Sequence, residues 1–410
     1  MPRPFVSLIP VLAALVLAAC QDDATAPTDP AAAVATTTAV WTQVTVGAQH
    51  TCALASTARA YCWGHAENGE LGTGTTANHL ASPTRVSGGL SFAQISAGTE
   101  HTCAVTTGRK AYCWGSNLFR QLGDGTTASR RVPVPVAGGR SFSQIRAGAW
   151  HTCALTPTGK AFCWGGNQYG ALGDGTTTTR TTPVAVLGGL TFRRLMVGGL
   201  HTCGVTTSDK AYCWGRGVEG QLGTGLQKNN LKPVLVAGGR SWRAVLPGSN
   251  HTCGITTADK AYCWGSYHTD TYTGLGTGSN EEGSLAPTPV AGTRTWRQLT
   301  AGSLHTCGVT LTNIPFCWGF NFTGQNGDGT TTIATGVPTL VAGGLKFTGM
   351  ATGVERLRES DSPVAQHTCG ITAGGLIYCW GNNFYGQLGT GQAFPGQSRS
   401  LVPVKAKMPG

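Results

Sequence analysis

The chain has 410 residues and a formal net charge of +11, with 11% charged residues, 61 glycines and four methionines. The basic residues are spread along the chain without a basic run, so the charge predicts a solvated surface rather than a nucleic-acid-binding patch. No helical periodicity of useful length follows the apolar N-terminal stretch, which favours short strands and many turns over a helical fold. A chain of this length buries a core without a cofactor, and we predict none.

The first forty residues predict export and a lipid anchor. Arg3 precedes an apolar stretch, 5–17, that is too short to span a bilayer comfortably but suits a signal-peptide core. The stretch ends in Leu-Ala-Ala-Cys20, which resembles a bacterial lipobox, and this resemblance implies cleavage before Cys20 and lipidation of its thiol. We therefore predict a lipoprotein signal peptide over 1–19, followed by a lipidated cysteine and flexible tether over 20–40. An unlipidated secretory signal is the alternative.

Beyond the tether, the dominant feature is a repeat of about 50 residues. The triplet His-Thr-Cys occurs seven times, and a second cysteine followed by Trp-Gly comes ten positions after the first. A period near 50 in β-rich sequence predicts a propeller or a similar closed array, so seven units predict seven blades. The pairs are Cys52/Cys62, Cys103/Cys113, Cys153/Cys163, Cys203/Cys213, Cys253/Cys263, Cys307/Cys317 and Cys369/Cys379.

Each cysteine pair lies on a predicted β-hairpin, in which two short strands are joined by turn-forming residues. The constant spacing allows the two cysteines to lie directly opposite each other, where Cβ separations of about 4.5 to 5.5 Å need only modest adjustment to close a disulfide. A zinc site would need clustered ligands such as paired Cys-x-x-Cys, and none occurs. We therefore predict one local disulfide per blade, in a compartment where disulfides persist.

Four strands per unit are predicted, and an aromatic residue marks the start of each unit. In the seventh unit, Phe347 stands twenty residues before His367 instead of nine, so this blade has gained about eleven residues, roughly 354–366. Whether Trp41 to Val46 forms the inner strand of the first blade or an outer strand of the last is left open. The other marker aromatics are Trp41, Phe92, Phe142, Phe192, Trp242 and Trp296.

The order of these elements resembles the regulator of chromosome condensation repeat. The elements are His-Thr-Cys-Ala-Leu, Ala-Tyr-Cys-Trp-Gly-Ser-Asn, Gln-Leu-Gly-Asp-Gly-Thr, Pro-Val-x-Val and Gly-Gly-x-x-Phe, and the seven copies cover 41–406, with 407–410 as a tail. The resemblance implies an all-β, seven-bladed β-propeller of four-stranded antiparallel blades. Family members differ in function, from guanine nucleotide exchange on a small nuclear GTPase to ultraviolet-B sensing and tight protein binding, so the fold alone does not choose a function.

Two of these family functions are disfavoured by the residues. Predicted export removes the protein from nuclear GTPases and chromatin, which argues against nucleotide exchange. The photoreceptor's repeated Gly-Trp-Arg-His-Thr motif is present only as Gly-Ala-Trp150-His-Thr, so a tryptophan cluster for light sensing is not expected. The positions equivalent to Trp150 are Gln49, Glu100, Leu200, Asn250, Leu304 and Gln366.

The repeated polar residues are interpreted as structural, and no metal site or catalytic residue is predicted. A histidine that recurs in every blade with the same neighbours is expected to hydrogen-bond the backbone of the adjacent turn. Asp124, Asp174 and Asp328 each offer a single carboxylate in an Asp-Gly-Thr sequence, which predicts a turn rather than a calcium site.

The loops that follow each Trp-Gly differ between blades, and propeller topology places them on one face. Their aromatic and charged residues predict a discontinuous rim that binds a protein or, less favoured, a polysaccharide. The competing interpretation is that these aromatics only cover neighbouring blades. The candidate residues are Glu67, Phe119, Arg120, Tyr169, Glu219, Tyr267, Tyr272, Phe320, Phe322, Phe384 and Tyr385.

The sequence thus predicts a monomeric, non-catalytic binding scaffold, anchored by lipid in the bacterial cell envelope, with the choice between inner and outer membrane left open. The expected partner is an envelope protein, and no nucleic acid is expected. Two alternatives stay open: a structural surface spacer, and a secreted lyase or hydrolase that uses carboxylates of two inserted loops. Those carboxylates are Glu355, Glu359 and Asp361 together with Asp270, Glu281 and Glu282.

Overall fold

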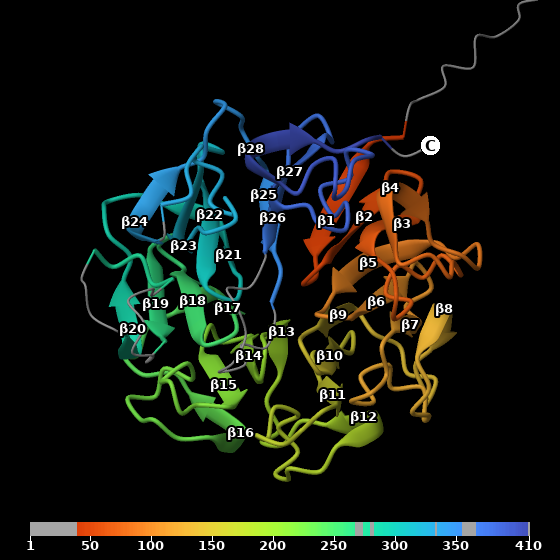
Figure 1. The fold of residues 1–410 in the computed structure, drawn as a ribbon. Coiled ribbons are helices and arrows are strands. Elements are labelled where there is room, and N and C mark those ends of the chain that lie inside the picture. The colour runs from red at the N-terminus through yellow and green to blue at the C-terminus, as the bar shows by residue number, and fades with distance from the viewer. Residues whose placement is uncertain (1–38, 267–273, 279–282, 333, 355–365, 409–410) are drawn as a thin grey trace, which may run out of the picture. The chain divides into compact units, whose positions relative to one another are not determined.

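The computed structural model describes residues 39–266, 274–278, 283–332, 334–354 and 366–408. These residues form 28 β-strands, and no helix occurs among them. The strands make seven four-stranded antiparallel sheets arranged around a central axis (Figure 1), which confirms the predicted seven-bladed propeller. Within the described ranges, no helical segment has the length and apolar character needed to cross a membrane.

Each blade runs outward from the axis in chain order. The inner strands are β1 (Trp41–Val46), β5 (Phe92–Ala97), β9 (Gln144–Ala147), β13 (Phe192–Val197), β17 (Trp242–Pro247), β21 (Trp296–Ala301) and β25 (Gly349–Thr352). The second strands are β2 (His50–Ala55), β6 (His101–Thr106), β10 (His151–Leu155), β14 (His201–Thr206), β18 (His251–Thr256), β22 (His305–Thr310) and β26 (His367–Ile371).

The two outer positions of each blade follow the same order. The third strands are β3 (Ala60–His65), β7 (Ala111–Gly115), β11 (Ala161–Gly165), β15 (Ala211–Gly215), β19 (Ala261–Gly265), β23 (Pro315–Phe320) and β27 (Ile377–Asn382). The outermost strands are β4 (His79–Arg85), β8 (Arg130–Pro135), β12 (Arg180–Ala185), β16 (Asn230–Leu235), β20 (Ser284–Pro289), β24 (Ala334–Leu340) and β28 (Arg399–Lys405).

The second and third strands of every blade carry the predicted disulfide. The two cysteines of each pair are cross-strand partners with Cα atoms 4.1 Å apart, which confirms the prediction of one local bridge per blade. The bridges are Cys52–Cys62, Cys103–Cys113, Cys153–Cys163, Cys203–Cys213, Cys253–Cys263, Cys307–Cys317 and Cys369–Cys379.

All fourteen of these cysteines are fully buried, so they belong to the core and not to any exposed surface. The bridges pack against the aromatic residues of the next blade; Cys203 and Cys213, for example, share a cluster with Trp242 and Trp264. Each bridge therefore ties its own hairpin together and also fills part of a blade interface.

The tryptophan that follows the second cysteine fills the space between blades. All seven have no exposed surface, and the marker aromatic of the same blade lies 5.5 to 6.2 Å away, ring centre to ring centre. The preceding blade must approach the tryptophan with a glycine: Gly123 has φ +67°, and a Cβ there would lie 2.5 Å from the Trp164 ring. The seven are Trp63, Trp114, Trp164, Trp214, Trp264, Trp318 and Trp380.

The seventh blade consists only of the last four strands of the chain, β25 to β28. Strand β1 is the inner strand of the first blade, and β28 pairs only with β27, so no strand is exchanged between the first and last blades. The seam is instead closed by side chains: Trp41 and Trp63 pack against Ile377 and Leu388, and Trp63 Nε1 donates a hydrogen bond to the Gln387 carbonyl at 2.9 Å. The question left open by the sequence is thereby resolved.

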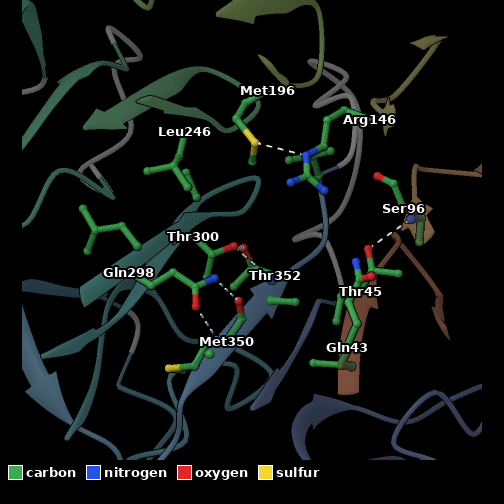
Figure 2. A pocket seen from close by; sticks show the side chains of 18 of the residues that line it. Gln43, Thr45, Ser96, Arg146, Met196, Leu246, Gln298, Thr300, Met350 and Thr352 are labelled. Atoms are coloured by element: carbon green, nitrogen blue, oxygen red, sulfur yellow. Dashed lines mark hydrogen bonds between the residues drawn. The ribbon is translucent and has the colours of Figure 1, made fainter. Parts of the chain in front are cut away.

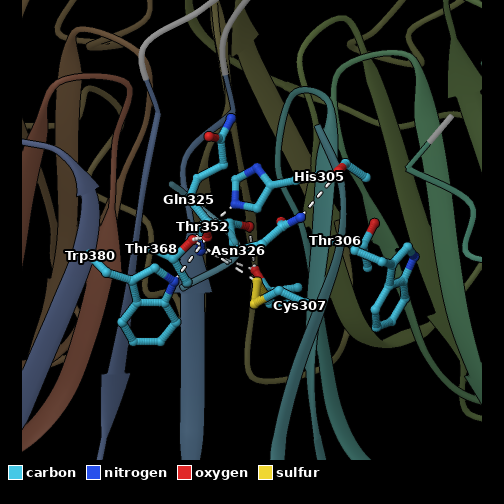
Figure 3. The surroundings of a disulfide bond; sticks show 12 residues. His305, Thr306, Cys307, Gln325, Asn326, Thr352, Thr368 and Trp380 are labelled. Carbon is cyan, nitrogen blue, oxygen red and sulfur yellow. Dashed lines mark hydrogen bonds between the residues drawn. A yellow bond between two sulfur atoms is a disulfide. The ribbon is translucent and has the colours of Figure 1, made fainter. Parts of the chain in front are cut away.

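The repeated histidine and threonine link neighbouring blades. His305 Nε2 donates to Thr368 Oγ1 of the next blade at 2.9 Å, and Thr368 in turn donates to the Gln325 carbonyl at 2.9 Å (Figure 3). Trp380 Nε1 donates to the same carbonyl, also at 2.9 Å. The prediction that the histidine ring bonds the backbone of the adjacent turn is therefore wrong. The backbone groups of that turn already pair with each other, as the Gly302 N–H does with the His305 carbonyl at 2.8 Å.

These histidine–threonine bonds form a closed ring of seven. The distances run from 2.6 to 2.9 Å. Burial lowers the pKa of His50 and His305 to about 4 and that of the other five to about 3, so all seven rings are neutral at pH 7. The pairs are His50–Thr102, His101–Thr152, His151–Thr202, His201–Thr252, His251–Thr306, His305–Thr368 and His367–Thr51.

Candidate protein-binding face

The variable loops meet the turns between first and second strands at one end of the blades, because consecutive strands are antiparallel. The second residue after each blade tryptophan donates its backbone N–H to the carbonyl of the residue before the histidine, at 2.8 to 3.0 Å, as from His65 to Gln49. We call this surface the Trp-Gly loop face. It comprises the turns before each histidine and the loops 65–72, 116–123, 166–173, 216–223, 320–327 and 382–389, with Ser266 and 274–276 from the fifth blade.

The loops are held rigidly by their own polar side chains. Asn117 Nδ2 donates to the Thr126 and Ala128 carbonyls at 3.1 Å, and its Oδ1 accepts from the Leu122 N–H at 3.1 Å. Asp124 Oδ1 accepts from the Thr126 N–H at 2.9 Å, as the turn interpretation of the Asp-Gly-Thr sequences expects. Such loops present their exposed residues at low conformational cost.

The fourth residue after each blade tryptophan points into solvent. Four of the six such positions that the structure describes are apolar: Leu118 is 70% exposed, Val218 42%, Phe322 49% and Phe384 44%. The other two exposed tips are Glu67 and Gln168. Phe394, itself 54% exposed, stacks on Phe384 with ring centres 4.8 Å apart and enlarges the apolar surface there.

The fifth residue after the tryptophan instead covers the neighbouring blade. Phe119 stacks on Trp150 with ring centres 4.2 Å apart, and Tyr385 meets the edge of His65 at 4.6 Å. The Arg216 guanidinium lies over the Tyr169 ring, with Cζ 5.6 Å from the ring centre. For these three aromatics, the structure supports the interpretation of inter-blade packing.

Two further candidates do not lie on the exposed rim: Phe320 is 6% exposed and Glu219 is 3% exposed. The Glu219 carboxylate turns inward, where it forms an ion pair with Arg216 and accepts a hydrogen bond from Gln221 Nε2 at 2.6 Å. Arg120 is half-buried, with its backbone in the left-handed region at φ +64°. The face therefore contains fewer of the predicted residues than expected.

Several predicted residues lie outside the part of the chain that the structure describes. They are Cys20, the candidate face residues Tyr267 and Tyr272, and the carboxylates of the enzymatic alternative, Asp270, Glu281, Glu282, Glu355, Glu359 and Asp361.

Two exposed tips, Leu118 and Val218, were not among the predicted face residues. The prediction used aromatic residues in the loops rather than any apolar residue at one fixed position. Aligning the loops on the blade tryptophan places both residues in the same column as Phe322 and Phe384. That alignment needs only the sequence and is the signal that would have found them.

A charged cluster on this face distinguishes the first blade. His65 Nδ1 bonds Glu70 Oε1, and its Nε2 lies 3.6 Å from Glu67. Burial alone would lower the pKa of His65, but the hydrogen bond and charge of Glu70 outweigh it and raise the pKa. Burial alone would raise the pKa of Glu70, yet the hydrogen bond from His65 lowers it. Glu70 is therefore a buried carboxylate in the first blade, whereas the equivalent position of the second blade is the uncharged Gln121.

Four-stranded blades that carry variable loops at one end define a repeat-built β-propeller. The family model of the RCC1-like domain matches residues 18–246, and that of the regulator of chromosome condensation (RCC1) repeat matches residues 365–387. Since the first match covers more than half of the chain, the protein belongs to the RCC1-like domain family. The resemblance seen in the sequence is confirmed.

Sequence relatives match only a short part of this chain. The probable E3 ubiquitin-protein ligase HERC4 of Homo sapiens is 36% identical over 93 residues, which are 22% of this chain and 9% of that protein. The ultraviolet-B receptor UVR8 of Arabidopsis thaliana is 34% identical over 93 residues, 22% of this chain and 21% of the receptor. The matched segments therefore span a small fraction of these relatives.

Solved structures share the fold over much longer stretches. Prp20p of Saccharomyces cerevisiae, described with its binding to Gsp1p and histones, superimposes with a TM-score of 0.73 and 20% identity over 90% of this chain and 87% of its own. Human WBSCR16 gives a TM-score of 0.70 and 20% identity over 77% of this chain and 85% of its own. At this identity the likeness concerns the fold alone.

Proposed function

We propose that this protein is a non-catalytic scaffold that binds another protein through the Trp-Gly loop face. The observation that carries the proposal is the set of exposed apolar tips at one fixed loop position, displayed by rigid loops of the second, fourth, sixth and seventh blades. These tips are Leu118, Val218, Phe322 and Phe384. Interfaces gain most of their energy from a few apolar anchors held in place before binding, and these tips meet both conditions.

The rigidity of the scaffold supports the same function. One disulfide per blade and the histidine–threonine ring fix the relative positions of the loops. A partner that contacts several tips at once loses little freedom on the propeller side, so weak single contacts add up.

The test is capture from the cell envelope with three versions of the propeller as bait. The face variant carries Leu118→Ala, Val218→Ala, Phe322→Ala and Phe384→Ala. The matched control truncates four exposed apolar residues of the outermost strands, Val132, Leu235, Leu340 and Val402, which are 40 to 53% exposed. We expect the parent and the control to retain the same protein. The face variant should bind it with an affinity at least about tenfold lower and should therefore fail to retain it. Equal recovery by all three would contradict the proposal.

The choice of residues follows from packing. Phe119, Tyr169 and Tyr385 contact neighbouring blades, so their truncation would disturb inter-blade packing as well as any binding surface. The four exposed tips avoid this ambiguity.

We further propose that the scaffold is exported and attached to the bacterial envelope by a lipid on Cys20. The lipobox-like sequence and the fourteen cysteines paired in disulfides support this location, because such bridges persist in oxidising compartments. Metabolic labelling with a radioactive fatty acid in a bacterial host should mark the parent and not Cys20→Ala. Equal labelling of the two would remove the anchor from the proposal.

A further inference from the structure

A cavity of about 380 Å³ lies on the axis of the propeller and is lined by residues from all seven inner strands. Its lining extends from Thr42 to Val46 along β1 and from Thr348 to Val354 around β25. This volume falls within the range of small-molecule sites, which are commonly about 300 to 1,000 Å³. Of the residues that line the cavity, only Val354 belongs to the Trp-Gly loop face, and a ligand site in the cavity does not depend on the function proposed for that face.

One ring of equivalent residues determines the chemistry of the cavity. In every blade, the inner-strand residue opposite the first cysteine lines the cavity. Where this residue carries a hydroxyl it accepts a backbone N–H from the next blade, as Thr45 does from Ala97 at 3.0 Å and Ser96 from Ala147 at 3.1 Å. The seven residues are Thr45, Ser96, Arg146, Met196, Leu246, Thr300 and Ala351.

Arg146 cannot fill that structural role, because a guanidinium has no acceptor. Its Nε donates to Met196 Sδ at 3.2 Å, which leaves the fork of Nη1 and Nη2 directed into the cavity (Figure 2). Among the residues that the structure describes, none bonds these two nitrogens, and the described lining includes no aspartate or glutamate. The described lining therefore holds a positive charge without a counter-charge.

A second arginine nearby increases the local positive charge. Arg194 replaces the glutamine that joins inner strands in other blades, as Gln43 does by donating to the Ile95 carbonyl at 2.7 Å. Burial and the charge of Arg194 together lower the pKa of Arg146 to about 10, so both guanidiniums remain charged at pH 7. Arg194 is exposed and lies outside the cavity lining, so the desolvated charge in the cavity is that of Arg146, and keeping it there is costly unless an anion accompanies it.

The wall beside Arg146 is apolar. Met196 and Leu246 follow Arg146 around the ring (Figure 2). Pro247, next to Leu246 in the chain, also lines the cavity. A guanidinium fork matches the two oxygens of one carboxylate, and a single positive charge suits a monoanion better than a phosphate dianion. An aliphatic chain attached to the carboxylate would lie against the apolar side chains.

We propose that the central cavity binds a small aliphatic monocarboxylate, held through its carboxylate by Nη1 and Nη2 of Arg146 and through its chain by Met196, Leu246 and Pro247.

Calorimetric titration of the full-length protein at pH 7 and low ionic strength, with acetate, butyrate, hexanoate and inorganic phosphate as probes, tests the proposal. We expect saturable binding of one molecule per chain, with affinity rising from acetate to hexanoate and phosphate binding more weakly than hexanoate. Absence of saturable binding for all three acids at millimolar concentration would overturn the site. Phosphate binding as tightly as hexanoate would overturn the carboxylate and chain assignment. Both outcomes are measured on the unmodified protein.

Variants then test the role of Arg146. Arg146→Gln should weaken hexanoate binding at least about tenfold. Arg146→Lys keeps the charge but lacks the guanidinium fork, so its hexanoate affinity should lie between that of the parent and that of Arg146→Gln. Arg85→Gln, at an exposed position on β4, changes the net charge equally and should leave binding unchanged. If Arg85→Gln weakens binding as much as Arg146→Gln does, a general charge effect is responsible and the proposal fails. Circular dichroism of each variant confirms that it is folded before titration.

Discussion

The repeated histidines are the residues most sensitive to pH, since each is buried and neutral within its blade interface. Their folded-state pKa values of about 3 to 4 lie below the usual 6.5. The unfolded chain therefore takes up protons first as the pH falls, and stability is lost between pH 6.5 and the folded pKa values. The raised pKa of His65 acts in the opposite direction for that one histidine, while the lowered pKa of Glu70 adds to the loss of stability as the pH falls.

The difference between the histidine pKa values of the folded and the unfolded chain predicts that the protein loses stability steeply as the pH falls. Between pH 6 and pH 4, each buried histidine lowers the free energy of unfolding by up to about 1.4 kcal/mol per pH unit. Guanidinium unfolding under non-reducing conditions at pH 7, 6, 5 and 4 measures this slope. A free energy that stays constant from pH 6 to pH 4 would show that the histidines are not held neutral in the folded protein.

The sequence predicted a structural role for these histidines but assigned the wrong partner. A hydrogen bond to the threonine of the next blade joins residues about 50 positions apart, such as His201 and Thr252, and the local sequence carries no sign of that contact. The disulfides were predictable because both partners belong to one hairpin.

At the scale of the strand and hairpin, the repeat predicted most of the fold. Strand number, the opposition of the cysteines and the burial of the blade tryptophans all follow from a periodic pattern. The exposure of single loop residues was missed because the prediction used residue type instead of position in the repeat: Phe384 is the fourth residue after its tryptophan and is exposed, whereas Phe119 is the fifth and stacks on Trp150. Inter-blade contacts, rather than composition, decide which aromatics reach solvent.

Removing one bridge should destabilise the propeller without preventing it from folding. For the double variant Cys203→Ala/Cys213→Ala, the chain-entropy estimate for a loop of about ten residues is a loss of roughly 2 to 3 kcal/mol, to which lost packing around Trp242 and Trp264 adds. Denaturant unfolding of the variant and the parent gives the difference. A change below about 0.5 kcal/mol would mean that the hairpin is equally constrained without the bridge.

At the scale of the whole propeller, the described blades form a ring whose seam resembles the other blade interfaces. His367 bonds Thr51 across the seam at 2.6 Å, and Trp63 bonds the Gln387 carbonyl, as the equivalent residues do at the other interfaces with the exception of Trp214. The first and last blades are thus joined by side-chain bonds and packing rather than by a shared sheet. The order of strands in the closing blade could not be predicted, because a strand's own pattern does not identify its neighbour.

Equivalent interfaces predict equivalent costs for removing their hydroxyls. Thr51→Val at the seam and Thr252→Val within the ring each leave a histidine N–H and a carbonyl without their threonine partner, so each should lower the free energy of unfolding by about 1 to 3 kcal/mol. Thr127→Val, at an exposed loop position, serves as the control and should be nearly neutral. A much smaller effect of Thr51→Val than of Thr252→Val, measured by the same denaturant titration, would identify the seam as the weakest interface.

The ten-residue separation within each bridge also governs how the cysteines find their partners. Fourteen thiols permit a very large number of pairings, yet each correct partner is the nearest along the chain and lies on the opposite strand of the same hairpin. A newly made chain therefore encounters correct pairs before distant ones. We therefore expect maturation of this protein to require an oxidant but little reshuffling of disulfides by an isomerase.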